Sequence, residues 1–307
     1  MSLLVVGTVA FDAIETPFGT REKTVGGSAS FLGHAASYFT KPHLVSVIGD
    51  DFPEEVLAKY QARGIDTQGI ERQKGGKTFF WKGRYDQNLN VAHTLETQLN
   101  VLATFEPKVP AAYRSLPYVM LGNFDPVLQR RVVEQLSGTK LVAADTMNYW
   151  ITDHNAELRK TLKHVHMLSV NEGEARMLSG EWNLRKAALA IADMGPKIVV
   201  VKRGEYGATL FTEDGIFVAP AFMLETALDP TGAGDSFAGG LLGHVARLDS
   251  VKPRVLRQAI VMGSSLGSFA VEGFGLERYD SLEPGEIRER FEQLHALTNF
   301  ETAGIPW

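Results

Sequence analysis

Short apolar runs alternate with longer amphipathic segments along most of the chain, which is typical of strands and helices following one another. The first run, Leu3 to Val9, is continuous, and this predicts a strand buried on both faces of a parallel sheet. The other runs that predict strands lie at residues 44–48, 118–121, 140–144, 165–170, 198–202, 208–211 and 215–219. Helical patterns lie at residues 26–39, 53–63, 126–136, 154–163, 172–178, 184–194, 232–247, 253–271 and 284–298. The pattern therefore predicts a three-layer α/β/α fold around a mostly parallel central sheet.

Two segments depart from this rhythm, at about 12–25 and 69–101. The second contains the run Lys77 to Tyr85, whose aromatic and β-branched residues alternate in part with polar ones. That pattern is typical of half-exposed antiparallel strands. We therefore expect a single domain over residues 1–307, with a small β-strand lid formed by these two segments.

Composition narrows the classes of function. The chain has 307 residues, a formal net charge of −5 and no long basic cluster, which argues against a nucleic-acid partner. It has no cysteine, so disulfides, thiolate metal sites and cysteine nucleophiles are excluded. No stretch of about 18 apolar residues is present, and the N-terminal apolar run is too short for a signal peptide. We expect a cytoplasmic protein without a membrane partner.

The most informative stretch is Asp229 to Gly240, a loop of very small residues that runs into a helical pattern. At a helix N-terminus, the backbone N–H groups of Gly232, Ala233 and Gly234 would favour an anion, with no side chain in the way. Asp235 follows in the first turn, where its carboxylate can accept a proton from a nearby hydroxyl. Fixed N–H dipoles beside a carboxylate suit phosphoryl transfer, in which charge develops on the migrating group. An aspartate near its ordinary pKa of about 4 can serve as the base.

The whole string from Asp229 to Gly240 strongly resembles the second signature of the ribokinase-like (PfkB) family of carbohydrate and nucleoside kinases. The resemblance implies that Asp235 is the general base and that Gly232, Ala233 and Gly234 hold the transferring phosphate. An acid-capped helix packed through its glycines is the alternative for a bare Gly-Ala-Gly-Asp.

Two N-terminal motifs fit the substrate side of the same family. Asp12 follows the first strand, where the resemblance implies an aspartate that binds vicinal substrate hydroxyls; an Asx turn is the alternative. Gly26 and Gly27 open a helix, as in the family's first signature, and let substrate approach the backbone. Phe31 stands where many members have an asparagine that touches the sugar. It is expected to offer a stacking surface, unless it belongs to the core.

Two further motifs fit the nucleotide side. Asn171 and Glu174 match an Asn-x-x-Glu motif that organises Mg²⁺ and phosphate, although the same pair forms a helix capping box. Lys202, Gly204 and Gly207 resemble the family's nucleotide loop; a tight hairpin is the alternative.

Weaker matches complete the resemblance. Asn100 and Asn123 lie where members place polar substrate contacts. Gly273 lies near the adenine pocket and the monovalent-cation loop of some members. The resemblance thus implies ATP and Mg²⁺ as cofactors, and it leaves a monovalent cation open.

The sequence thus predicts a Mg-ATP-dependent kinase that phosphorylates a hydroxymethyl group of a sugar or nucleoside. The aromatic residues expected near the acceptor favour a nucleoside because they can stack on a base. They are Phe11, Phe31, Phe79, Phe80 and Trp81. A sugar-phosphate kinase stays open, since Lys77, Lys82 and Arg84 could bind a phosphate, and so does a non-catalytic nucleotide- or sugar-binding protein. A dehydrogenase is disfavoured because no Gly-x-Gly-x-x-Gly follows the first strand. The resemblance also leaves open a homodimer in which the lid strands of two subunits pair.

Overall fold

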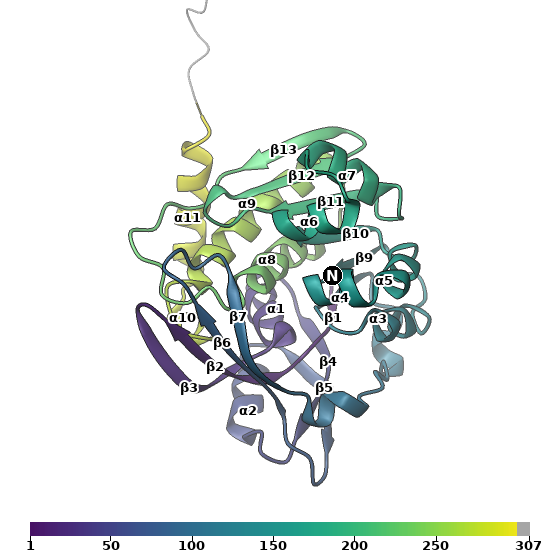
Figure 1. The fold of residues 1–307 in the computed structure, drawn as a ribbon, viewed down its shortest axis with the longest axis vertical. Coiled ribbons are helices and arrows are strands. Elements are labelled where there is room, and N and C mark those ends of the chain that lie inside the picture. The colour runs from purple at the N-terminus through teal and green to yellow at the C-terminus, as the bar shows by residue number, and fades with distance from the viewer. Residues whose placement is uncertain (300–307) are drawn as a thin grey trace, which may run out of the picture.

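One large sheet runs through the computed structural model, which describes residues 1–299. Its strands are β1 (Leu3–Val6), β4 (Pro42–Gly49), β5 (Asp66–Gln73), β8 (Tyr118–Leu121), β9 (Leu141–Asp145), β10 (Met167–Asn171), β11 (Ile198–Lys202), β12 (Ala208–Thr212) and β13 (Gly215–Ala219). They lie in the order β13-β12-β11-β10-β9-β8-β1-β4-β5 (Figure 1). Pairing is parallel from β5 to β11, and only β12 and β13 join antiparallel. The predicted mostly parallel sheet is confirmed.

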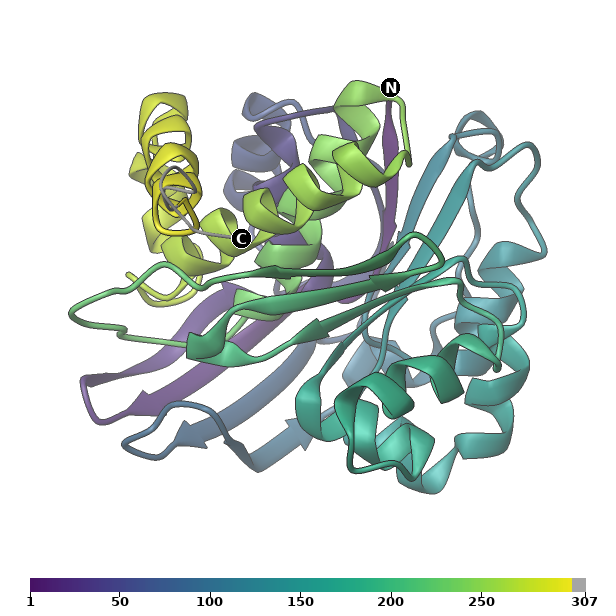
Figure 2. The ribbon, with the colours of Figure 1, turned by 90° about the horizontal axis from the view of Figure 1, so that it is seen from above.

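Helices cover both faces of this sheet (Figure 2). One face carries α1 (Ser28–Ser37), α2 (Glu54–Ala62), α8 (Ala233–Leu248), α9 (Pro253–Ala270), α10 (Glu277–Ser281) and α11 (Pro284–Ala296). The other carries α3 (Pro126–Val133), α4 (Asn148–Asp153), α5 (Asn155–Leu162), α6 (Glu172–Ser179) and α7 (Leu184–Ala192). Short 3₁₀ helices are η1 (Asn100–Thr104), η2 (Ala111–Tyr113) and η3 (Gly204–Tyr206). Within residues 1–299, no helix is both long and apolar enough to span a bilayer.

The central strands are mostly apolar because both of their faces are buried. In β1, Leu3 and Val5 pack into the core under α1 and α8, whereas Leu4 and Val6 pack into the opposite core. Successive side chains of a strand point to opposite faces, so a strand between two helical layers needs apolar residues at every position. This explains the continuous run that predicted β1.

The carboxyl ends of the parallel strands meet along one edge of the large sheet. The chain leaves β1 in one direction toward β4 and β5, and it fills the opposite direction with β8 to β11. In open α/β sheets, the crevice at such a reversal of strand order is where ligands bind. Asp145, Asn171 and Lys202 are the last residues of β9, β10 and β11, so they all lie along this edge.

A second, smaller sheet stands beside this edge. Its strands are β2 (Ala10–Thr16), β3 (Gly19–Gly26), β6 (Phe79–Tyr85) and β7 (Ala92–Gln98), in the order β3-β2-β6-β7. We call these four strands the lid sheet. One expectation is corrected: residues 69–73 belong to β5 of the large sheet. The antiparallel pairing expected for the lid is found between β2 and β3 and between β6 and β7, whereas the central pair, β2 and β6, is parallel.

Candidate active site

The loop before α8 forms a cradle of backbone N–H groups. Gly232 is the N-cap of α8 and has a φ of 74°, in the left-handed region that favours glycine. A Cβ atom here would lie 2.4 Å from the ring of Phe31. The first-turn N–H groups of Gly234 and Asp235 have no partner inside the helix, as at any helix start. Together with the helix dipole, they favour an anion at this place.

Asp229 fixes the position of this loop. Its carboxylate is fully buried and accepts hydrogen bonds from the backbone N–H of Thr231 at 2.8 Å and of Gly275 at 3.0 Å. Burial raises the pKa of Asp229, while these hydrogen bonds oppose the rise. The loop that contains Gly273 is thereby tied to the start of α8.

Asp235 lies in the first turn of α8, half-buried, beside a buried ion pair. Lys202 Nζ contacts Asp145 Oδ2 at 2.8 Å, and a Cβ atom on Gly234 would lie 3.1 Å from the same ammonium. Burial, and then the charge of Asp145, raise the pKa of Asp235 to about 7, whereas Lys202 opposes the rise. An ordinary pKa was expected for this aspartate. The sequence could not reveal the burial and the neighbouring carboxylate that change it.

Asn171 and Glu174 form a capping box at the start of α6. Glu174 N–H donates to Asn171 Oδ1 at 2.8 Å, and Asn171 N–H donates to Glu174 Oε2 at 2.8 Å. The helix-cap alternative is therefore what the structure contains. Burial and the charge of Asp145 raise the pKa of Glu174 to about 7, with Lys202 and the bond from Asn171 opposing.

The side chains at the carboxyl ends of β9 and β10 could act as ligands of a hard cation. Asp145, Asn171 and Glu174 can supply carboxylate and amide oxygen atoms, the ligand type that Mg²⁺ prefers. Within residues 1–299, no group of three or more His, Cys, Asp and Glu side chains is arranged as a metal cage. Such a sparse donor set fits Mg²⁺ that arrives with phosphate groups and keeps several waters, as this ion usually does.

Asp12 lies near the start of β2 in the lid sheet, where it is 4% exposed. A Cβ atom on Gly26 would lie 1.8 Å from Asp12 Oδ2, so only glycine leaves room for this carboxylate. Burial and then the charge of Asp229 raise the pKa of Asp12 to about 7; the backbone N–H of Gly27 opposes this rise and Asp235 adds to it. The charge of Asp235 therefore bears on the pKa of Asp12.

The stacking role expected for Phe31 is corrected by its burial. Its side chain is 1% exposed, belongs to the core beneath α8, and supports Gly232 from below. A ring enclosed in this way has no face left for a ligand. The core alternative for Phe31 is the correct one.

The predicted nucleotide loop lies at the end of β11. Gly204 and Gly207 have φ values of 56° and 86°, and a Cβ on Gly207 would lie 2.1 Å from the carbonyl oxygen of Ala219. Gly207 is therefore required by the close approach of β13. A Cβ on Gly204 would lie 2.8 Å from Asn90 Oδ1, so the loop between β6 and β7 reaches this turn.

The two predicted asparagines have separate environments. Asn100 Nδ2 donates to the carbonyl of Thr78 at 2.9 Å, which ties together the two ends of the β6–β7 hairpin. Asn123 follows β8 and accepts a hydrogen bond from Trp150 Nε1 at 2.9 Å. Trp150 was not singled out from the sequence, since nothing in its local pattern links it to Asn123.

Two other residues of the crevice were also missed. Asp145 ends a buried strand next to Asn171 and Lys202, and its position at a strand's carboxyl end was a usable signal. Tyr85 ends β6, and its phenol oxygen accepts a hydrogen bond from Thr231 Oγ1 at 3.1 Å. No sequence signal connects residues 146 positions apart.

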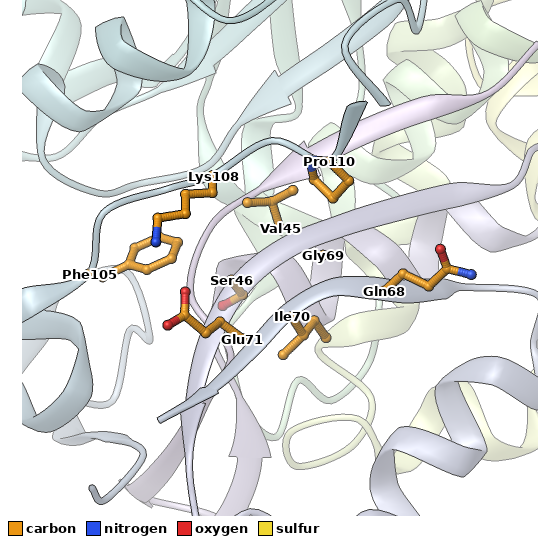
Figure 3. A pocket seen from close by; sticks show the side chains of 9 residues that line it. All are labelled: Val45, Ser46, Gln68, Gly69, Ile70, Glu71, Phe105, Lys108 and Pro110. Atoms are coloured by element: carbon orange, nitrogen blue, oxygen red, sulfur yellow. The ribbon is translucent and has the colours of Figure 1, made fainter. Parts of the chain in front are cut away.

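A pocket of about 280 Å³ lies elsewhere, at the edge formed by β4 and β5 (Figure 3). Ser46, Glu71, Phe105 and Lys108 point toward it in this view. Ser46 Oγ already accepts the backbone N–H of Val9 at 3.0 Å. The pocket includes none of the predicted site residues.

Comparison of the chain with known proteins identifies one family. The profile of the pfkB family carbohydrate kinases matches residues 2–280. A cytidine kinase of Thermococcus kodakarensis is 30% identical over 254 residues, which are 80% of this chain and 89% of that protein.

Solved structures share the fold at lower sequence identity. A nucleoside kinase of Burkholderia thailandensis, solved with inosine, superimposes with a TM-score of 0.79 at 21% identity and covers 96% of this chain and 98% of its own. An aminoimidazole riboside kinase of Salmonella enterica, solved with aminoimidazole riboside and an ATP analogue, superimposes with a TM-score of 0.75 at 19% identity. The match covers 95% of this chain and 100% of that chain. The predicted ribokinase-like fold and kinase activity are confirmed, and the chain belongs to the pfkB family of carbohydrate kinases as a nucleoside or sugar kinase.

Proposed function

We propose that this kinase transfers the γ-phosphoryl group of ATP to the hydroxymethyl group of a nucleoside, with Asp235 as the general base. One arrangement carries the proposal. Asp235 stands in the N–H cradle at the start of α8, and β6, which pairs with the strand of Asp12, reaches the same loop through the hydrogen bond between Tyr85 and Thr231. An acceptor held by Asp12 would therefore lie between the two carboxylates.

The raised pKa of Asp235 suits a general base. A base is most effective when its pKa lies near the working pH, and burial and Asp145 bring that of Asp235 to about 7. The acceptor oxygen forms a bond to the γ-phosphorus, and the bond from that phosphorus to the β–γ bridging oxygen breaks. The hydroxyl proton goes to Asp235, and ADP leaves. The N–H groups of Gly234 and Asp235 and the ammonium of Lys202 stabilise the charge on the transferring oxygens.

The opposite side of the cradle fits the nucleotide. Lys202 lies beside Gly234 at the start of α8, where it could reach phosphates, and Gly204 lies in the turn just after β11. Asp145, Asn171 and Glu174 would hold Mg²⁺, largely through water. When bound, Mg²⁺ neutralises phosphate charge.

The lid sheet supplies an aromatic surface on the acceptor side. Asp12 pairs with Trp81 in the register of β2 and β6, so both side chains lie on the same face of the lid sheet. The Trp81 ring extends over Gly83, where a Cβ atom would lie 2.0 Å from it, and its Nε1 donates to Thr94 Oγ1 at 3.1 Å. We propose that Trp81 stacks on the base while Asp12 binds the ribose hydroxyls, in place of the role once assigned to Phe31.

The same register disfavours a sugar phosphate as acceptor. Lys82 and Arg84 alternate with Trp81 along β6, so they point away from the face that carries Asp12, and both are exposed. Neither cation is therefore placed to bind a phosphate beside Asp12. The relative from Thermococcus kodakarensis, a cytidine kinase, also supports a nucleoside.

An acceptor panel tests the proposal. ADP release with Mg-ATP would be measured for nucleosides, pentoses, ketohexoses and their phosphates, and the products would be identified by mass. We expect a nucleoside to give the highest kcat/KM and to gain one phosphate on its hydroxymethyl oxygen. A free sugar or sugar phosphate with higher kcat/KM than every nucleoside would overturn the proposed acceptor and leave the kinase assignment intact.

A further inference from the structure

The end of the lid sheet contacts the loop that opens the catalytic helix. Tyr85 is the last residue of β6, and its phenol oxygen accepts a hydrogen bond from Thr231 Oγ1 at 3.1 Å. Thr231 immediately precedes Gly232, and its backbone N–H is held by Asp229. The lid is therefore joined by a side-chain bond to the part of the chain that forms the N–H cradle.

The phenol of Tyr85 lies between the lid sheet and the loop before α8. Tyr85 is only partly exposed, and burial, followed by the charges of Asp229, Asp12 and Asp235, raises its pKa, while the bond to Thr231 opposes the rise. A neutral phenol next to several carboxylates is more stable than an ionised one. Tyr85 is thus placed between the acceptor side and the start of α8.

A second contact extends the closure to the nucleotide side. Asn90, in the loop after β6, lies so close to Gly204 that a Cβ atom there would be 2.8 Å from its Oδ1. The β6–β7 hairpin therefore reaches both the catalytic loop and the end of β11 of its own chain. By contrast, all seven residues of β7 are exposed.

We propose that Tyr85 is a positioning residue that latches the lid sheet onto the catalytic loop through Thr231. In this arrangement, closure over the acceptor and ordering of the N–H cradle occur together. The inference rests on the proposed phosphoryl transfer at Asp235, and it adds a contact that couples the lid to that step. Closure through Tyr85 over a bound acceptor would keep water from the γ-phosphate.

A double-mutant cycle tests the latch. Tyr85→Phe and Thr231→Val each remove one hydroxyl and keep the shape of the side chain. Because a hydrogen bond contributes about 0.5–1.5 kcal/mol net, each variant should lower kcat/KM for the acceptor about 3- to 10-fold. Each should also raise the ratio of ATP hydrolysed to acceptor phosphorylated. The double variant should resemble either single variant, because both remove the same bond.

Tyr118, at the edge of the large sheet where the parallel strands begin, provides the matched control. Tyr118 Oη donates to Asp249 Oδ1 at 2.9 Å, at the amino end of β8. Tyr118→Phe also removes a phenol hydrogen bond, and it should leave the acceptor kcat/KM and the coupling ratio unchanged.

Hydrogen exchange separates the latch from the chemistry. In the ligand-free protein, Tyr85→Phe and Thr231→Val should both speed amide exchange in residues 79–98, and Tyr118→Phe should not. Fold-losses in kcat/KM that multiply in the double variant, or unchanged exchange in 79–98, would overturn the latch whatever acceptor the enzyme uses. Intact exchange effects in an enzyme that shows no kinase activity would instead refute the proposed function.

Discussion

The carboxyl edge of the large sheet and the lid sheet contribute to one crevice in different ways. At the edge, Asp145, Lys202 and the start of α8 are held by buried parallel strands and by a helix packed on α1 and α9. The lid contributes Trp81 and Tyr85 from strands whose outer members are largely exposed. The edge therefore holds its charges within a packed core, whereas much of the lid is open to solvent.

This difference suggests a division of labour. Reacting groups need fixed positions, because a small displacement of a base or of an N–H donor reduces its effect on the transition state. Acceptor recognition instead needs an element that opens and closes. Under the proposed function, variants of the edge should lower kcat, whereas variants of the lid should change the acceptor KM and the coupling of ATP use.

The largest effect is expected at the edge, for Asp235→Asn. Asparagine keeps the shape of the side chain but cannot take the proton, so kcat should fall by about 10³-fold or more while ATP still binds. Steady-state kinetics and nucleotide titration would measure the two quantities. Asp280→Asn is the control, since that side chain is 60% exposed on α10. Near-normal turnover of Asp235→Asn would remove this residue from the mechanism.

A smaller loss of about 10²-fold in kcat is expected for Lys202→Met, from the missing charge near the phosphates. Lys202 also holds down the pKa of Asp235, so its removal should raise that pKa further. The acidic limb of the kcat profile should accordingly move to higher pH, because Asp235 must be ionised to act as a base.

Two further variants serve as controls: one keeps a positive charge at position 202, and the other removes a positive charge elsewhere. Lys202→Arg should recover part of the activity and return the acidic limb toward that of the parent enzyme. Lys197→Met removes an exposed lysine from the other end of β11 and should leave the profile in place. If the acidic limb of the kcat profile does not shift in Lys202→Met, the coupling between Lys202 and Asp235 is contradicted.

The lid is tested by Trp81→Ala. Loss of base stacking should raise the nucleoside KM about 10-fold, with a smaller change in kcat, because stacking on one base contributes about 1–3 kcal/mol. Trp81→Phe should be intermediate. Trp182→Ala is the control, since this tryptophan is 81% exposed and lies after α6. A loss confined to kcat would show that Trp81 acts on the chemical step. It would contradict the expectation that lid variants mainly change the acceptor KM.

The smallest effect concerns stability, and it probes where edge and lid meet. The pKa of Asp12 is about 7 in the folded protein, above the ordinary value of 3.8, so its ionisation opposes folding. As the pH rises from about 4 to about 7, the unfolding free energy of ligand-free Asp12→Asn should rise relative to that of the parent protein. Above that range the difference should stay constant. Denaturant titrations across pH would measure it, and a difference that does not vary with pH would contradict the burial of an ionisable Asp12.

Much of the large sheet could be predicted because its signals are local. The continuous apolar runs anticipated β1 and the strands after Pro110, and the small residues from Asp229 onward anticipated the loop and helix that follow. The lid was predicted less well. Residues 69–73 were assigned to it together with the aromatic run at 77–85, whereas their pairing with β4 places them in the large sheet. Edge strands and lid strands have similar compositions, so only pairing distinguishes them.

The sequence by itself determined the family, the α/β architecture and the small-residue turn at 232–234, because each depends on residues adjacent in the chain. Tertiary structure alone decided that Phe31 supports Gly232, that Asp145 pairs with Lys202, and that Tyr85 reaches Thr231. It also decided the raised pKa of Asp235, since burial and neighbouring charge come from distant parts of the chain. Spacing along a chain records local geometry, whereas contacts between distant segments follow from how whole layers pack.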